Sequence, residues 1–251
     1  MEKREKLYEG KAKIVYATDD PGKVIQYFKD DATAFNALKR GTIVGKGVIN
    51  NKMSATLLQR LAKTGVPTHY LATLSDREML CRKLDIIKIE VIVRNIVAGS
   101  LAKRTGLAEG VAIKPPIVEL YYKSDELGDP MITEEHVRML KLASPKEVAW
   151  TKRMALKINA HLRPLLKRKG LILVDFKLEF GRHGGKLYLG DEISPDTCRL
   201  WDADTLEKLD KDRFRRDLGG LLEAYTEVAK RLGIMSEGER PQGTGPVLVK
   251  G

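Results

Sequence analysis

The stretch from Leu171 to Asp202 constrains the fold more than any other part of this chain. From Val174 to Phe180, apolar side chains alternate with charged ones, and a period of two is typical of a β-strand with one apolar face. The sequence Gly-Arg-His-Gly-Gly that follows predicts a turn, and Lys186–Ile193 predicts a returning strand. We therefore expect an antiparallel hairpin here.

The charged residues of this hairpin are expected to crowd one face. Directly opposed residues of antiparallel strands share a face, so a pairing of Phe180 with Lys186 places Asp191 beside the charged residues of the first strand. Those residues are Asp175, Lys177 and Glu179. A sheet needs no such concentration for its stability, and this favours a functional site. An ordinary hairpin with a solvated polar face is the alternative.

The net charge of +11 permits two kinds of partner, nucleic acids and anionic metabolites. The basic residues are scattered, with no zinc-finger spacing and no aromatic RNA-binding strand, which makes nucleic acid the weaker choice. No apolar run approaches the roughly 20 residues that span a bilayer, and the charged start MEKREKLYEG does not resemble a signal peptide. Cys81 and Cys198 are too few and too far apart for a disulfide framework, which fits a reducing cytoplasm.

The first part of the chain predicts an antiparallel sheet and then a helix. Two short strands within residues 7–17 and a third over Val24–Phe28 form the expected sheet. A glycine-bearing loop, Gly41–Gly47, precedes a helix over Val48–Lys63, which Gly65 ends.

A strand rich in branched residues is expected over Ile86–Val93, directly after a connector. A chain of 251 residues can form one large domain or two lobes. We place a lobe boundary at the connector. Residues 1–84 then form a β-rich lobe that binds nucleotide, and residues 85–251 form a larger lobe that binds substrate and metal.

Further elements follow in the second lobe. Lys114-Pro115-Pro116 predicts a break before a strand over Ile117–Lys123. Thr133 marks the start of one helix. Ser144 and Glu147 form a capping box at the start of another, which ends before Gly170.

A last amphipathic helix is expected over Asp212–Leu232, ended by Gly233. The pair Gly219-Gly220 lies inside it, where glycine is unfavourable, so we expect another backbone to pack closely there. The tail from Ser236 is expected to be extended or loose.

Two segments are candidates for a phosphate-binding loop. Around Gly10, backbone N–H groups could approach phosphates while Lys11 and Lys13 supply positive charge, although a plain hairpin is the alternative. Gly41–Gly47 comes close to the P-loop pattern. We reject it, because it is one residue short and lacks the Ser or Thr that binds magnesium.

Arg94 and Ser100 form a candidate anion site. A strand delivers Arg94, and Gly99 then lets the backbone approach a ligand where a short helix begins. Ser100 would lie at the N-terminus of that helix, where a phosphate monoester is favoured, and Arg94 could bind the same anion through two hydrogen bonds. A serine cap beside a surface arginine is the alternative.

Glu179 and Asp191 are hard oxygen ligands, suited to Mg²⁺ that nucleotide phosphates also hold. Lys177 is either an ion-pair partner of Asp175 or a cation for a substrate carboxylate. Cys198 has no histidine near it in sequence, so we expect a small buried residue and not a nucleophile. None of the histidines has metal-binding spacing, and all are expected to be structural or exposed: His69, His136, His161 and His183.

Several motifs occur in a consistent order from about Leu7 to Gly233: GKAKIVY, GKG with Asn50-Asn51, RKLD, VRNIVAGSLAKR, ILVDFKLEFG, LGDEISPD and RLWD. Together they closely resemble the SAICAR synthetase family, the phosphoribosylaminoimidazole-succinocarboxamide synthases of purine biosynthesis. The resemblance implies a two-lobed α+β fold, with a kinase-like or ATP-grasp-like nucleotide cleft between an N-terminal antiparallel sheet and a larger mixed lobe. It implies a ligase that joins L-aspartate to carboxyaminoimidazole ribonucleotide (CAIR) and converts ATP to ADP and phosphate.

The resemblance also implies roles for residues that match the family motifs. The nucleotide is expected at Gly10, Lys11, Ala12, Lys13, Val15, Arg82, Lys83, Leu84, Glu179 and Asp191. The catalytic set is Glu179, Asp191, Lys177 and Lys13, and the metal ligands are Glu179 and Asp191. Substrates are expected at Arg94, Ser100, Lys123, Asp175, Lys177, Asp196, Arg199 and Arg215.

The implied cofactors are ATP and Mg²⁺. The implied partners are the small-molecule substrates and a second copy of the chain, in the cytoplasm, with neither nucleic acid nor membrane. Transfer of the ATP γ-phosphoryl group to the CAIR carboxylate would create a leaving group for attack by the aspartate amine. Such chemistry needs positioning and cations but no enzyme nucleophile.

Two other functions stay open from the residues alone. One is a small-molecule phosphotransferase with a kinase-like cleft, although the chain has no HRD or DFG element. The other is a basic nucleic-acid-binding protein. One departure from the family is Asn36-Ala37, where many members carry Asp-Gly, so the family's role for that loop in substrate binding does not carry over directly.

Overall fold

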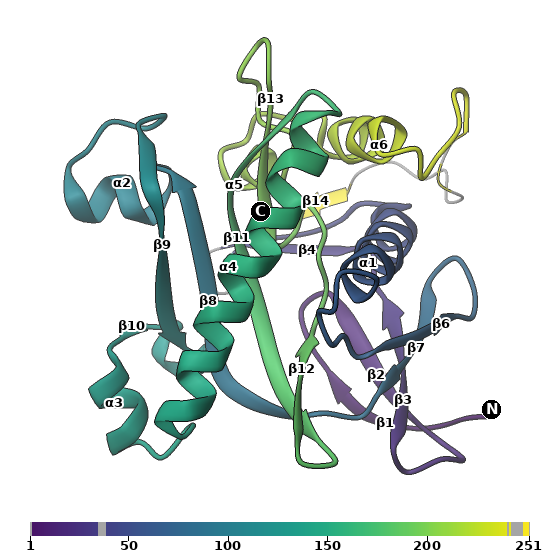
Figure 1. Ribbon diagram of the computed structural model, residues 1–251. Coiled ribbons are helices and arrows are strands. Elements are labelled where there is room, and N and C mark those ends of the chain that lie inside the picture. Colours follow the sequence, from purple (N-terminus) through teal and green to yellow (C-terminus); the bar gives the residue numbers. More distant parts are fainter. Residues whose placement is uncertain (1, 35–38, 240, 242–247, 251) are drawn as a thin grey trace.

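The N-terminal part of the chain forms a five-stranded antiparallel sheet in the order β1-β2-β3-β7-β6 (Figure 1). The structure, a computed structural model, describes residues 2–34, 39–239, 241 and 248–250. The strands of this sheet are β1 (Lys3–Glu9), β2 (Lys13–Thr18), β3 (Lys23–Phe28), β6 (Tyr70–Thr73) and β7 (Glu78–Arg82). The predicted N-terminal sheet is confirmed.

A second, six-stranded sheet carries the predicted hairpin near its centre. Its strands are β8 (Asp85–Ile96), β9 (Ala112–Tyr122), β10 (Met131–Ile132), β11 (Leu171–His183), β12 (Lys186–Gly190) and β13 (Cys198–Asp202). β11 pairs antiparallel with β8, β12 and β13. A small third sheet contains β4 (Asp31–Ala34), β5 (Lys39–Thr42) and β14 (Leu248–Lys250).

Alternation along β8 and β11 gives the second sheet one apolar and one charged face. The apolar side chains enter the main hydrophobic cluster; they include Ile89, Val91, Val93, Phe176, Leu178 and Phe180. The intervening side chains line a cleft; they are Glu90, Ile92, Arg94, Asp175, Lys177 and Glu179. Because Asp175 and Glu179 are only 3% and 4% exposed, the alternative of a solvated polar face is wrong.

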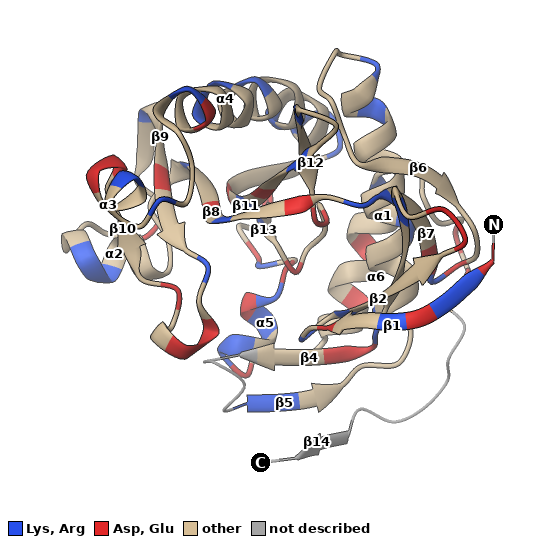
Figure 2. Ribbon diagram, turned by 90° about the horizontal axis from the view of Figure 1, so that it is seen from below, with Lys and Arg blue, Asp and Glu red and all other residues tan. Residues whose placement is uncertain are grey.

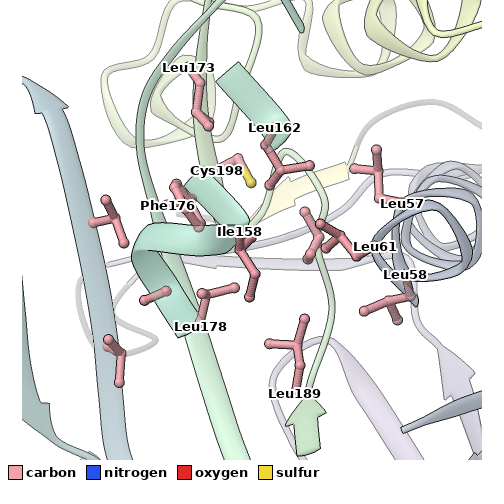
Figure 3. Close-up of a cluster of buried hydrophobic side chains, with 14 of the residues drawn as sticks. Leu57, Leu58, Leu61, Ile158, Leu162, Leu173, Phe176, Leu178, Leu189 and Cys198 are labelled. Carbon is pink, nitrogen blue, oxygen red and sulfur yellow. The ribbon is translucent and has the colours of Figure 1, made fainter. Parts of the chain in front are cut away.

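Two long helices contribute to this hydrophobic cluster, and one of them, α4, covers the apolar face. α4 (Pro145–Lys167) begins at the predicted capping box, and α1 (Lys46–Ala62) confirms the predicted helix after the glycine-bearing loop. Figure 3 shows their side chains meeting those of the second sheet: Leu57, Leu58, Leu61, Ile158, Leu162, Phe176 and Leu178. The shorter helices are α2 (Ser100–Thr105), α3 (Glu134–Met139), α5 (Asp212–Arg215), α6 (Leu221–Arg231) and the 3₁₀ turn Asp125–Leu127.

The outer surface of α4 is strongly basic. Figure 2 shows Lys and Arg along this helix, and the sequence between Val148 and Gly170 contains no Asp or Glu. Since α4 lies on the apolar face of the second sheet, part of the +11 net charge is far from the cleft. None of the helices in the described part of the chain is long and apolar enough to cross a membrane.

The hairpin of β11 and β12 is confirmed, but its expected pairing is wrong. Phe180 pairs with Leu189, and Lys186 pairs with His183. The turn therefore consists of Gly184 and Gly185 alone, with φ of +54° and +73°. Two consecutive residues with positive φ make the tightest hairpin turn, and glycine adopts that conformation without strain.

Strand β9 includes the segment where a break was predicted. It begins at Ala112 and continues through Pro115 and Pro116. Its second neighbour, β10, pairs only with Leu120 and Tyr121 in the described structure, so the prolines lie where β9 is a sheet edge. A proline at an edge leaves no ladder hydrogen bond unmade.

The expected last helix is two helices, α5 and α6. Between them, Asp217, Gly219 and Gly220 all have positive φ, which a helix cannot accommodate. The predicted close packing at the glycine pair is also wrong at Gly219, where an added Cβ would meet nothing within 4 Å. These glycines form the turn between α5 and α6, and they do not allow close packing of a helix.

Two further expectations concern the Asn36-Ala37 loop and the tail from Ser236, and both segments include residues that the structure does not describe. Asn36-Ala37 lies outside the described residues. In the tail, Leu248–Lys250 pairs with β5, and Gly45 at the start of α1 lies against the ring of Pro241.

The main hydrophobic cluster extends across the predicted lobe boundary. It contains Leu57 and Leu61 from before residue 84 and Phe176 and Leu178 from after it. The two sheets are thus joined by a shared core through α1. The division into lobes 1–84 and 85–251 stays a prediction.

Candidate active site

A cleft of about 910 Å³ opens over the charged face of the second sheet. Its walls come from the β1–β2 hairpin, from β8 and β11, and from the loops after β12 and β13. The cleft brings together these predicted residues: Gly10, Lys11, Ala12, Lys13, Val15, Arg94, Ser100, Lys123, Asp175, Lys177, Glu179, Asp191, Asp196, Arg199 and Arg215.

Three of the residues expected to bind the nucleotide, Arg82 to Leu84, are not part of this lining. The Arg82 guanidinium lies 5.3 Å from the centre of the Tyr188 ring on β12. The backbone N–H of Lys83 donates to the Gly22 carbonyl oxygen at 2.8 Å. These contacts fix the connection between the two sheets beside the cleft.

Lys177 occupies the centre of the charged floor. Its Nζ lies 2.5 Å from Glu179 Oε1, 3.0 Å from Glu90 Oε1 and 3.3 Å from Asp191 Oδ2. Lys123 approaches the same oxygen of Glu179 at 2.8 Å. Burial opposes the charge of Lys177, but Glu179, Asp191 and Glu90 outweigh it and raise its pKa. One ammonium group thus holds three carboxylates together.

Asp191 reaches the cleft from the turn after β12 and not from the strand. β12 ends at Gly190, and Asp191 has the left-handed φ of +57°. This turn aims its carboxylate at Lys13 and Lys177. Burial opposes ionisation of Asp191, but the charges of the two lysines outweigh it and hold its pKa below the usual range. Glu179 and Asp191 therefore converge on one cleft despite the wrong register.

Sequence reasoning missed Glu192, Glu90 and Lys211, all of which line the cleft. Glu192 is 4% exposed, lies 3.7 Å from Lys13 Nζ and has a buried Oε2 without a hydrogen-bond partner in the described structure. Glu90 could have been found, because it shares a face of β8 with Arg94. Lys211 comes from an irregular loop, where no periodicity marks it.

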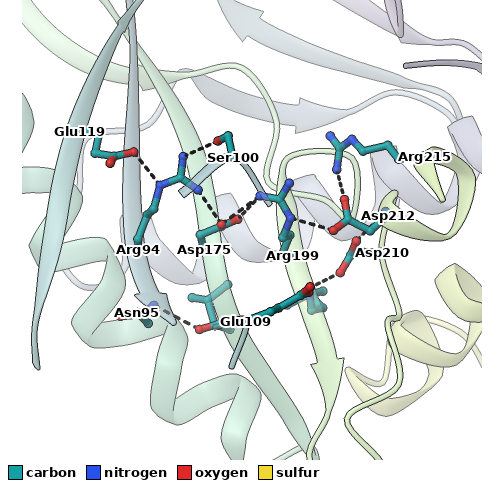
Figure 4. A network of polar contacts seen from close by, with 12 residues as sticks. Arg94, Asn95, Ser100, Glu109, Glu119, Asp175, Arg199, Asp210, Asp212 and Arg215 are labelled. Atoms are coloured by element: carbon teal, nitrogen blue, oxygen red, sulfur yellow. Dashed lines mark hydrogen bonds and ion pairs between the residues drawn. The ribbon is translucent and has the colours of Figure 1, made fainter. Parts of the chain in front are cut away.

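Arg94 and Arg199 meet on a shared carboxylate, Asp175 (Figure 4). Arg94 Nη1 donates to Asp175 Oδ2 at 2.8 Å, and Arg199 Nη1 donates to the same oxygen at 2.9 Å. The expected ion pair of Asp175 with Lys177 is therefore wrong. The bulged pairing of β11 with β13 brings Asp175 opposite Arg199, and the pairing with β8 brings it opposite Arg94.

Other contacts hold the two arginines in place. Arg94 Nε donates to Glu119 at 2.6 Å, and Arg94 Nη2 lies 3.3 Å from Ser100 Oγ. Arg94 is 2% exposed, so the alternative of a surface arginine is wrong. On the other side, Asp212 accepts from Arg199 Nε at 2.9 Å and from Arg215 at 2.7 Å.

The start of α2 is built around the side chain of Arg199. Gly99, the residue before α2, has φ +55° and ψ −127°, a conformation that only glycine adopts readily. A Cβ at Gly99 would lie 2.5 Å from Arg199 Nη2. The predicted backbone approach at Gly99 is thus an approach to an arginine, which Ser100 and Arg94 flank.

Asp196 lies at the buried end of the cleft. Its Oδ2 accepts from Lys46 at 2.6 Å and from Asn50 at 2.9 Å, and its Oδ1 accepts from the Tyr225 hydroxyl at 2.7 Å. Burial opposes its ionisation, but the charges of Lys211 and Lys46 outweigh it and lower its pKa. Asp196 thereby ties α1 and α6 to the loop that precedes β13.

The cysteines and histidines have structural surroundings. Cys81 and Cys198 are buried free thiols, and burial raises the pKa of Cys198 to about 12, so it does not supply a thiolate. His136 completes the cap of α3, and His183 contacts the Lys83 carbonyl oxygen. His69 is buried, and burial together with the charge of Lys13 lowers its pKa to about 4, so its ring is neutral at physiological pH.

The donor set of the cleft fits Mg²⁺ that is held mainly by phosphates. Glu179 and Asp191 already share the Lys177 ammonium, and the Oε2 of Glu192, which has no hydrogen-bond partner in the described structure, adds a buried oxygen nearby. No group of three or more His, Cys, Asp and Glu side chains in the described chain could hold a metal alone. A phosphate-bound Mg²⁺ needs only one or two protein carboxylates.

Comparison with known proteins gives consistent matches. A family model described as SAICAR synthetase matches residues 6–232. A phosphoribosylaminoimidazole-succinocarboxamide synthase from Persephonella marina is 60% identical over 92% of this chain and 98% of its own length. The crystal structure of such a synthase from Ehrlichia chaffeensis is 48% identical, covers 92% of this chain and 100% of its own, and has a TM-score of 0.90. A SAICAR synthetase in complex with ADP is 49% identical, covers 94% of this chain and 99% of its own, and has a TM-score of 0.89.

Proposed function

Because this chain belongs to the SAICAR synthetase family, we propose that its cleft binds ATP, CAIR and L-aspartate on the residues named above. The enzyme is a carbon–nitrogen ligase that binds an adenine nucleotide and forms SAICAR in purine biosynthesis. One observation supports this function most directly. Glu179 and Asp191 both contact the Lys177 ammonium, and Asp191 also pairs with Lys13 of the glycine-bearing hairpin.

The ATP phosphates bind under the β1–β2 hairpin, where Gly10 to Lys13 line the cleft. Lys13 is paired with Asp191 and supplies positive charge to the phosphate oxygens. Glu179 and Asp191 would hold Mg²⁺, which supplies charge neutralisation to the phosphates when bound. Glu192 lies 3.7 Å from Lys13, and burial raises the pKa of its carboxyl.

The ribonucleotide phosphate binds at Arg94, Ser100 and Arg199. The two guanidinium groups are already oriented by the shared Asp175, so binding needs little side-chain reorganisation. Arg215, held by Asp212, extends the same positive edge of the cleft. Lys123 and Lys177 lie on the floor, where they can orient the carboxylate that reacts.

Two steps account for the chemistry. The CAIR carboxylate attacks the γ-phosphorus of ATP, the bond to ADP breaks and an acyl phosphate forms. The aspartate amine then attacks the acyl carbon, loses a proton and expels phosphate as the amide forms. Both steps develop negative charge on phosphoryl oxygens, next to the ammonium groups of Lys13 and Lys177.

Two measurements test this function. ADP release with each substrate omitted in turn should require both CAIR and aspartate, and turnover without aspartate would refute ligation. Label from ¹⁸O-carboxylate CAIR should appear in the released phosphate. Unlabelled phosphate would exclude the acyl phosphate intermediate but would not exclude ligation.

We further propose a homodimer in the cytoplasm. The region of β9, β10 and α3 leaves large apolar side chains exposed, which are Ile117, Leu127, Met131 and Met139. A second copy of the chain would cover them. Sedimentation of a Met131→Lys variant as a monomer would support this surface. Two buried free thiols are consistent with a reducing compartment.

A further inference from the structure

The guanidinium group of Arg94 is held from the side of β9 (Figure 4). Glu119 and Tyr121 are two residues apart on this strand, so their side chains share a face of the sheet. Arg94 Nε donates to Glu119 Oε2 at 2.6 Å, and Arg94 Nη2 donates to the Tyr121 hydroxyl at 3.1 Å. The same hydroxyl donates to Glu119 Oε2 at 2.9 Å. Glu119 and Tyr121 therefore fix one edge of the Arg94 guanidinium.

Arg104 of α2 contacts both of these β9 residues from outside the cleft. Its Nη2 pairs with Glu119 Oε1, and its Nη1 donates to the Tyr121 hydroxyl at 3.1 Å. The Arg104 side chain is 34% exposed and that of Glu119 is 10% exposed, and Arg104 does not line the cleft. Burial opposes ionisation of Glu119, but its hydrogen bonds and the charges of Arg94 and Arg104 outweigh burial and lower its pKa. Glu119 is thus a carboxylate shared between two arginines, with one oxygen for each.

The three nitrogens of the Arg94 guanidinium have partners of two kinds. Nε donates to Glu119, and Nη1 donates to the carboxylate of Asp175 at 2.8 Å. In the described structure, Nη2 has only the hydroxyl groups of Ser100 and Tyr121 as partners, at 3.3 and 3.1 Å. A phosphate oxygen carries charge and is a stronger acceptor than a hydroxyl. Nη2 is therefore the nitrogen of Arg94 that a phosphate would bind.

Glu119 is a natural competitor of the phosphate for this nitrogen. A carboxylate commonly binds an arginine through two parallel hydrogen bonds, one to each oxygen. Nε and Nη2 lie on the same edge of the guanidinium, since their acceptors, Glu119 Oε2 and the Tyr121 hydroxyl, are 2.9 Å apart. The second oxygen of Glu119, Oε1, is bound by Arg104 instead.

We propose that Arg104 is a positioning residue for the ribonucleotide phosphate site. By binding Oε1 it limits Glu119 to a single hydrogen bond with Arg94, and Nη2 stays available to the phosphate. Without Arg104, Glu119 turns its second oxygen to Nη2 and completes the two-bond pair. This role rests on the proposed binding of the ribonucleotide phosphate at Arg94.

Arg104→Met tests this role, because it removes both hydrogen bonds and the charge but keeps an unbranched side chain. Lys103→Met is the matched control. Lys103 is the preceding residue of α2, is also exposed and loses the same charge. Two ligands are compared, CAIR and its riboside, which lacks the phosphate. Calorimetry gives the Kd of CAIR, competition gives the Ki of the riboside, and steady-state ADP release gives KM and kcat.

We expect Arg104→Met to raise the Kd and the KM for CAIR about tenfold, the effect of one lost charge-assisted hydrogen bond. The kcat and the Ki of the riboside should keep their wild-type values, because neither depends on binding of the phosphate. Lys103→Met should keep the wild-type Kd, since an exposed charge contributes little. In a Glu119→Gln background, Arg104→Met should cause no further loss, because an amide lacks the second carboxylate oxygen. If Arg104→Met does not fold, Arg104→Gln should give the same results.

An unchanged Kd for CAIR in Arg104→Met would overturn this role, and so would a riboside Ki that rises as much as the Kd. An equal loss in Lys103→Met would assign the effect to overall charge, and an undiminished loss in the Glu119→Gln background would show that Glu119 does not transmit it. If the wild-type protein binds the riboside as tightly as CAIR, the phosphate site itself fails and the role of Arg104 fails with it. The wild-type comparison therefore distinguishes failure of the proposed function from failure of the inference alone.

Discussion

Some charged side chains in this cleft each contact two or three side chains of the opposite charge. Lys177 contacts Glu179, Glu90 and Asp191, and Asp175 accepts from both Arg94 and Arg199. Buried charges are stable only when they are paired and hydrogen-bonded. Removing one member of such a set therefore affects several others, and the substitutions that test the site must keep the volume and change one charge.

Glu179→Gln keeps the side-chain volume and removes the carboxylate that Lys177 and Lys123 contact at 2.5 and 2.8 Å. We expect turnover to fall by about a hundredfold or more, because the site loses the carboxylate that we propose as a metal ligand and gains uncompensated positive charge. The measurement is steady-state ADP release together with near-ultraviolet circular dichroism.

Glu147→Gln is the matched control for that change. Glu147 caps α4 and pairs with Arg182, so this variant should lose about 1 kcal/mol of stability and keep its turnover. Equal turnover loss in both variants, or an unfolded Glu179→Gln protein, would favour a structural role for Glu179.

Asp210 predicts a specific pH dependence of stability. Burial and the charge of Asp212 raise its pKa to about 7, whereas an unfolded aspartate has a pKa near 3.9. Between about pH 4 and 7 the folded protein therefore holds a proton that the unfolded chain releases, so this contribution to stability is complete below that range and is lost as pH rises through it.

Asp210→Asn should remove that pH dependence. In urea unfolding, the free energy of unfolding of the wild type relative to the variant should fall between pH 4 and 7, by up to about 1.4 kcal/mol per pH unit. Above pH 7 the difference should be constant. Parallel stability curves across the whole range would contradict the raised pKa.

At the scale of elements, the effect of a glycine or a proline depends on where it lies in the fold. The last predicted helix is interrupted because Asp217, Gly219 and Gly220 have positive φ, and β9 accepts two prolines because it lies at a sheet edge. Apolar periodicity predicted a helix through the glycines, and the prolines predicted a break in the strand, and both predictions were wrong. Backbone conformation at these positions depends on the contacts and hydrogen bonds that neighbouring elements make there.

The start of α2 is such a position, and Gly99→Ala tests it. The added Cβ would lie 2.5 Å from Arg199 Nη2 and 2.8 Å from its Cζ, so the guanidinium must move away from its place beside Asp175. We expect the KM for CAIR to rise about tenfold, the effect of one weakened charge-assisted hydrogen bond.

Gly106→Ala, at the other end of α2, is its control. Gly106 also has a positive φ, of +73°, but a Cβ there would meet nothing within 4 Å. Both variants should lose about 1 kcal/mol of stability from backbone strain. An equal KM in the two variants would show that Arg199 does not bind the ribonucleotide phosphate.

For the whole molecule, the arrangement of the two sheets creates the cleft. The β1–β2 hairpin belongs to the first sheet, and the charged floor belongs to the second, while the shared core and α1 lie behind them. A nucleotide in the cleft would contact both sheets at once, so its binding should stabilise the entire chain against unfolding.

ADP with Mg²⁺ should therefore raise the thermal midpoint. At a ligand concentration of 100 Kd the stabilisation is about 2.7 kcal/mol, which for a chain of this size corresponds to a shift of about 5–10 °C. Differential scanning fluorimetry measures it. Lys13→Met, which keeps most of the buried side-chain volume, should abolish the shift; a full shift in that variant would place the nucleotide elsewhere.

Local sequence patterns predicted most of the elements and the residue types of the site. Alternation over Val174–Phe180 predicted β11 and its charged face, capping residues predicted the start of α4, and motif order predicted the family. These features are local, since each depends on side-chain period or on a few neighbouring residues, and they can be read without knowing the rest of the fold.

Which of those residues meet depends on contacts between parts of the chain that are far apart in sequence. The register of β11 with β12 depends on two glycines in the turn, and the partners of Asp175 depend on strands 81 and 24 residues away in sequence. Asp191 enters the cleft through a left-handed backbone in the turn after β12. Ion pairs over such separations follow from strand pairing and packing, which a single sequence does not record.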